Sequence, residues 1–167
     1  MKKILILLLF IAAYSTATNA QEQNYKSLEL KVDSLQQQLD KLNYDYHYLE
    51  CTYKLDRLNI NLNVFLNSLR NTVDRLLIAI YHDRAYDANL YRMNKMEYDS
   101  FADLLDDYKT QASILKWSCA TKSESIGFND SDIKLLDSNF KAIGAAINSA
   151  EITLENYKKY IAVYKDL

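Results

Sequence analysis

The sequence predicts an all-α protein: an antiparallel up-down-up three-helix bundle with an N-terminal coiled-coil extension. Proline is absent and glycine occurs only twice, as Gly127 and Gly144, whereas a sheet protein needs turn residues roughly every 8–12 positions. Apolar residues make up 49% of the 167 residues, and over most of the chain they recur at the helical spacings of three and four. The predicted parts are a signal peptide at 1–20, a coiled-coil arm at 21–50 and the bundle at 51–167.

The start of the chain has the layout of a secretory signal peptide. Lys2 and Lys3 precede a continuous apolar run over 4–13, and small and polar residues then end at Ala20. We expect cleavage after Ala20, and a cut after Ala17 or an uncleaved anchor are the alternatives. The apolar run is shorter than the ~20 residues that span a bilayer, and no later segment has the character of a span. The sequence thus predicts a secreted or periplasmic protein of a bacterial cell envelope, with no membrane span in the mature chain.

The predicted arm carries a heptad pattern. Its apolar residues alternate spacings of four and three over about four heptads, which is typical of a left-handed coiled coil. We call the following residues the arm seam and predict that they contact a partner: Leu28, Val32, Leu35, Leu39, Leu42, Tyr46 and Leu49. Leucine at the d-like positions favours a parallel dimer, but Tyr46 is bulky, and Asp45 would meet Glu50 of a parallel partner as a like charge. The oligomer number therefore stays open, and packing within the same chain is the alternative.

A second seam begins at Cys51 in a shifted register and is widened by Leu66 and Leu77. We call it the bundle seam, and its residues are Cys51, Leu55, Leu58, Leu62, Phe65, Leu69, Val73, Leu76 and Ile80. A wider stripe is what a helix inside a bundle needs. No breaker separates the two seams, so we expect one helix from about residue 23 to about residue 83.

Two further helices complete the predicted bundle. The second covers 86–119, with Asp87 as its N-cap and Asn94 as the one polar residue in its apolar seam. The polar stretch 120–132 is the only segment with loop character. The third helix covers 131–166, has the cleanest three-and-four alternation, and is expected to be capped by Ser131 or Asp130.

Cys51 and Cys119 are the only cysteines, and in an oxidising compartment an even pair predicts a disulfide. Each lies on the apolar seam of its own helix. If the chain turns near residues 84–87, an antiparallel second helix brings residue 119 opposite the low fifties, where Cys51 lies. Two buried free thiols or a link between chains are the alternatives.

The sequence contains no set of residues that predicts catalysis. His47 and Glu50 lie one helical turn apart, but a di-iron bundle needs that spacing twice, so we expect a solvated helix face and no metal or cofactor. Asp99, Asp103, Asp106 and Asp107 are likewise expected on a solvated face. The 14 tyrosines are expected mostly at half-buried positions, with a minority available for binding.

The charge balance limits the partners. The net charge is −2, and removing Lys2 and Lys3 with the leader leaves 18 basic against 22 acidic residues. With no basic patch we expect no nucleic-acid partner. The preferred interpretation is a structural or interaction protein, not an enzyme, that self-associates or binds another envelope protein through the arm, most simply as a homo-oligomer. A holdase-type periplasmic chaperone is the alternative, and an enzyme or cofactor carrier is third.

Overall fold

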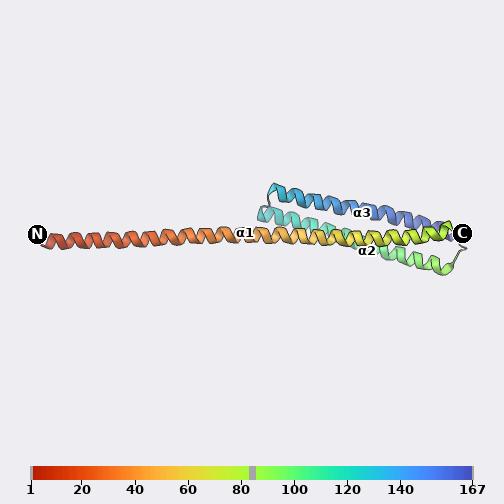
Figure 1. The fold of residues 1–167 in the computed structure, drawn as a ribbon, viewed down its shortest axis with the longest axis horizontal. Coiled ribbons are helices and arrows are strands. Elements are labelled where there is room, and N and C mark those ends of the chain that lie inside the picture. Colours follow the sequence, from red (N-terminus) through yellow and green to blue (C-terminus); the bar gives the residue numbers. More distant parts are fainter. Residues whose placement is uncertain (1, 83–85, 167) are drawn as a thin grey trace. The chain divides into compact units, whose positions relative to one another are not determined.

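The computed structural model describes residues 2–82 and 86–166 (Figure 1), and side chains are described from Glu22 onward. Three helices make up this described part: α1 (Lys2–Tyr81), α2 (Ala88–Ile126) and α3 (Asp130–Lys165). The all-α class and the three-helix bundle are therefore confirmed. The segment predicted as a signal peptide lies within α1, but the side chains on which that prediction depends lie outside the described residues.

The chain divides into two units, Met1–Asp45 and Tyr46–Leu167. We call them the arm unit and the bundle unit. The bundle unit begins before Cys51 because Tyr48 already packs edge-on against Phe128, with ring centroids 5.8 Å apart.

Contacts between side chains show that α1 and α2 run antiparallel in the bundle unit. Arg75 pairs with Glu97 at 3.6 Å, and Phe65 lies edge-on to Tyr108 with ring centroids 5.4 Å apart. Residues later in α2 thus contact residues earlier in α1, as the predicted up-down-up topology requires.

The third helix runs parallel to α1 and antiparallel to α2. Arg70 of α1 donates a hydrogen bond to the hydroxyl of Ser149 of α3 at 3.1 Å. Ser149 lies as far from the start of α3 as Arg70 lies from Cys51, the first residue of the bundle seam. Lys109 of α2 pairs with Glu151 at 2.7 Å. At the far end, the hydroxyl of Tyr164 accepts a hydrogen bond from the backbone N–H of Asp87 at 3.1 Å, which ties the end of α3 to the N-cap of α2.

The bundle seam forms the core, as predicted. Its residues from Cys51 to Leu76 are buried. Those from Phe65 to Leu76 pack in one cluster with apolar residues of α2 and α3, of which these are buried: Leu105, Ala150, Leu154, Tyr157, Ile161 and Tyr164. Asn94, the polar interruption, is buried with its hydrogen bonds satisfied. Its amide donates to the carbonyl of Leu90 at 2.8 Å, and its Oδ1 accepts from the Tyr157 hydroxyl at 2.8 Å. Because both partners are paired, the core tolerates this polar contact.

The connection between α2 and α3 is shorter than the sequence predicts. Asp87 is the N-cap of α2, as expected, and accepts from the N–H of Asn89 at 2.8 Å. The predicted loop over 120–132 is wrong, because α2 continues to Ile126. Thr121 and Ser125 lie inside the helix and donate their hydroxyls to preceding backbone carbonyls, so polar side chains do not interrupt it.

The cap of α3 also differs from the prediction. Asn129, and neither Ser131 nor Asp130, is the N-cap, and its side chain accepts from the N–H of Asp132 at 2.9 Å. Gly127 ends α2 in the left-handed conformation with φ 76°, and its N–H donates to the Ser123 carbonyl. Only Gly127, Phe128 and the cap residue therefore separate the two helices.

The two glycines are expected to respond oppositely to alanine. Gly127→Ala places a Cβ on a left-handed residue and should lower the free energy of unfolding by about 1 kcal/mol. Gly144 lies within α3, and an added Cβ would meet no atom within 4 Å. Gly144→Ala should therefore raise the free energy of unfolding by about 0.5–1 kcal/mol. Urea unfolding followed by circular dichroism measures both, and equal effects of the same sign would contradict this assignment.

Candidate functional site

The two seams lie on nearly opposite faces of α1 where they meet. Leu49 of the arm seam and Cys51 of the bundle seam are two residues apart, which at 3.6 residues per turn is a rotation of roughly 200°. Because α2 and α3 cover the bundle seam, the end of the arm seam that lies in the bundle unit faces outward. Tyr46 exposes 65% and Leu49 62% of its surface, whereas Cys51 exposes 2%.

The arm unit taken by itself also presents the seam to solvent. Its residues Leu28, Val32, Leu35, Leu39 and Leu42 are 57–66% exposed. Single exposed apolar residues are ordinary on protein surfaces, but a regular row of leucines along one face indicates a contact surface. This row is the candidate interaction site of the protein.

The two cysteines meet at the base of the bundle. Cys51 of α1 and Cys119 of α2 are both buried thiols in the structure. Burial raises the pKa of the Cys119 thiol, and its hydrogen bond with Cys51 raises that pKa further, while Lys122 and Lys54 act in the opposite direction. The antiparallel register thus brings the two cysteines together, and the disulfide itself stays a prediction.

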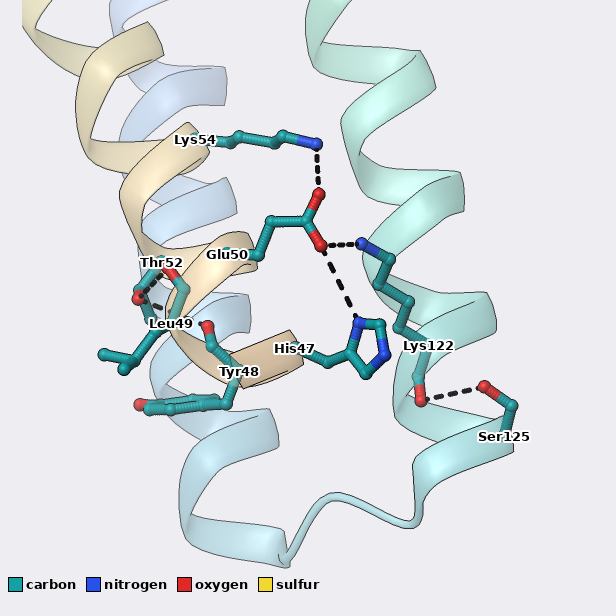
Figure 2. Close-up of polar contacts among 8 residues, drawn as sticks. All are labelled: His47, Tyr48, Leu49, Glu50, Thr52, Lys54, Lys122 and Ser125. Carbon is teal, nitrogen blue, oxygen red and sulfur yellow. Dashed lines mark hydrogen bonds and ion pairs between the residues drawn. The ribbon is translucent and has the colours of Figure 1, made fainter. Parts of the chain in front are cut away.

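Glu50, Lys54 and Lys122 form a charged cluster (Figure 2). It lies near the cysteines, since Lys122 and Lys54 both act on the pKa of Cys119. The Glu50 carboxylate lies between Lys54, one turn along α1 at 2.6 Å, and Lys122 of α2, to which it is hydrogen bonded. These two ammonium groups, Lys122 first, lower the pKa of Glu50 to about 2. The cluster therefore joins α1 to α2 at the same level as the thiols.

The expectation of a solvated face for His47 and Glu50 is wrong. Glu50 exposes only 25% and His47 only 26% of its side chain, and Lys122 of α2 lies against the Glu50 carboxylate. The imidazole Nδ1 of His47 is 3.7 Å from the Glu50 carboxylate, and within the described part of the chain it has no hydrogen-bond partner. The four aspartates of α2, by contrast, are exposed, as predicted: Asp99, Asp103, Asp106 and Asp107.

Two residues of this region were missed by sequence reasoning. Lys122 lies in the segment predicted as a loop, so no signal connected it with Glu50. Trp117, the only tryptophan, is 72% exposed on α2 near Ile114, which is 62% exposed. Ile114 and Tyr53 line a groove of ≈ 570 Å³ between α1 and α2, but its polar residues do not form a catalytic arrangement such as a nucleophile with an oriented base.

The described residues contain neither a metal centre nor a membrane span. In residues 22–82 and 86–166, no three histidine, cysteine, aspartate or glutamate side chains gather closely enough to hold a metal ion. Among the helices so described, none has both the length and the apolarity required to cross a bilayer.

Comparison with known proteins gives no match: no family model, no curated protein and no solved structure is significantly similar to this chain.

Replacing Glu50 should weaken the bundle in a pH-dependent way. A carboxyl group whose pKa is lowered on folding stabilises the protein above its ordinary pKa of 4.5, and this contribution is lost as the pH falls from there toward about 2. Glu50→Gln should lower the free energy of unfolding by roughly 1 kcal/mol at pH 7.

The test is urea unfolding of wild type and Glu50→Gln at pH 7 and near pH 3, where the difference between them should shrink. Glu155→Gln is the matched control, because Glu155 pairs with Lys159 on the open surface of α3 with 67% of its side chain exposed. An equal, pH-independent loss in both variants would contradict the role given to Glu50.

Proposed function

We propose that this protein is a secreted or periplasmic structural protein that self-associates through the arm seam. The observation that carries the proposal is the exposed row of leucines in the arm unit, whose heptad pattern also includes the exposed Tyr46 and Leu49 of the bundle unit. Since α2 and α3 pack against the bundle seam, they do not cover the arm seam on the other face of α1. A second chain can supply a matching apolar row that covers it. A second copy has its apolar residues at the same heptad spacing, so the side chains of the two seams can interlock along their length.

The exposed apolar area of the arm seam is large enough to drive association of two chains. Fully burying a leucine contributes about 1.5–3 kcal/mol, and a dimer would cover fourteen seam side chains that are each 57–66% exposed. Half of the full contribution from each gives roughly 10–20 kcal/mol, against an association cost of roughly 4–15 kcal/mol. This balance supports a dimer that forms at ordinary protein concentrations.

The proposed location rests on the leader and on the cysteines. The basic start, apolar run and small residues at 1–20 have the layout of an exported leader. In an oxidising compartment, Cys51 and Cys119 would form a disulfide, with both thiol protons released and two electrons passed to a disulfide oxidant by exchange. The bond would close a loop of about 69 residues, worth ~4 kcal/mol in the chain-entropy model. Its proposed role is to hold the base of the bundle together, next to the end of the arm seam.

Polar substitution in the arm seam is expected to abolish association. Leu35→Asn combined with Leu42→Asn removes two leucines from the seam without touching the bundle core, so the exported chain should change from a dimer to a monomer. Light scattering after size exclusion measures the mass, and circular dichroism checks that the variant remains helical.

Trp117→Ala is the matched control, because it removes an exposed apolar side chain of the bundle and should leave the mass unchanged. A wild-type chain that is monomeric at every concentration would refute self-association. An unchanged mass in the double variant would show that another surface is responsible.

The intact mass of the chain exported with its own leader tests the location and the disulfide together. We expect the mass to correspond to a chain that begins at Gln21 and lacks two hydrogens, and to rise by two hydrogens after reduction under denaturing conditions. Cys51→Ser should remove this difference and lower the free energy of unfolding by about 2–4 kcal/mol. A chain that keeps residues 1–20, or that carries two free thiols after export, would contradict the proposal.

A further inference from the structure

We propose that the second copy pairs antiparallel with the first, in the register that places Leu28 of one chain opposite Tyr46 of the other. The inference rests on the proposed self-association and adds to it the direction and register of the partner. It is carried by the side chains of the arm seam and by the charged residues that flank them.

The apolar layers of this register match large residues with smaller ones. When two helices run in opposite directions, an a-like position of one chain meets a d-like position of the other, so Tyr46 meets Leu28 and Tyr25 meets Leu49. The central layers pair Val32 with Leu42 and Leu35 with Leu39, and each layer occurs twice by symmetry. A parallel pair would instead place Tyr46 against the second copy's Tyr46 in a single layer, where two large rings compete for the same space.

The flanking charges also favour the antiparallel register. The residues beside the seam at the g-like positions face each other across an antiparallel pair, which brings Lys31 of each chain opposite Asp45 of the second copy. Both residues are exposed, and the two-fold symmetry makes this attraction twice. In a parallel pair, Lys31 would face the neutral Gln36, and Asp45 would face Glu50 as a like charge.

The antiparallel register has one unfavourable contact. At each end of the overlap, Glu22 lies opposite Glu50 of the second copy. The charge of that Glu50 is already balanced within its own chain by Lys54 and Lys122. This contact therefore costs less than two unpaired carboxylates would cost.

Shifting the antiparallel pair by one heptad in either direction is worse. One shift brings Glu29 opposite Glu50 of the second copy, and the other leaves Tyr46 without an apolar partner. Both shifts separate Lys31 from Asp45. The first shift keeps an equally long apolar overlap, with Tyr53 opposite Leu28 of the second copy, so the flanking charges decide in favour of the proposed register.

Charge exchange between Lys31 and Asp45 tests the direction. With the exported full chain at low salt, Lys31→Glu and Asp45→Lys should each raise the dimer Kd roughly tenfold, because each turns two attractions into two repulsions. The double variant restores opposite charges and should return the Kd to within about threefold of wild type, a coupling that only contacting residues show. Sedimentation equilibrium over a range of concentrations measures the four Kd values.

Lys41→Glu is the matched control, because it changes the charge of the arm equally at an exposed position away from the seam and should alter the Kd by less than about twofold. A dimer in which the two single changes do not compensate each other would overturn the antiparallel register but leave self-association standing. A Kd that is unchanged by Lys31→Glu and unchanged or lowered by Asp45→Lys would show a parallel pair. A wild-type chain that never dimerises would overturn both proposals.

Discussion

The burial of the bundle seam between α2 and α3 is the constraint on which the rest of the structure depends. Leu55, Leu62 and Leu69 are at most 1% exposed, and burial of such side chains is the dominant favourable term in folding. Once this face of α1 turns inward, the antiparallel register of α2 follows, and so does the meeting of Cys51 with Cys119. The outward direction of Tyr46 and Leu49 follows as well, because they lie on the opposite face of the same helix.

The base of the bundle concentrates the polar contacts that strengthen this register. Glu50 is held by lysines from two helices, and it lies one residue from a buried cysteine. At the opposite end of the bundle unit, Asn94, Tyr157 and Tyr164 supply buried or half-buried hydrogen bonds between α2 and α3. Because buried polar groups are costly unless they are paired, both sets favour this alignment over one displaced by a helical turn.

The stability of the bundle and the proposed association depend on different faces of the same helix. The inward face of α1 is complete within one chain, so the outward face is available to a partner without unfolding the bundle. The proposed self-association depends on this separation, because a second copy can contact the outward face without disturbing the core of the bundle. The proposed disulfide acts at the junction, where a loosened bundle would otherwise compromise the end of the arm seam.

The sequence by itself determined the helical class, the two seams, the N-cap at Asp87 and the proximity of the cysteines, because apolar periodicity and the absence of proline act locally and are visible along the chain. It could not determine where α2 ends, because Thr121 and Ser125 suit either a loop or a helix, and the carbonyls to which they donate are known only from the fold. It missed the link from Glu50 to Lys122 for a related reason: the two are distant in sequence, and only the packing of α1 on α2 brings their charges together. The tertiary structure alone also decided which seam faces inward, since both are apolar and only one can lie against α2 and α3.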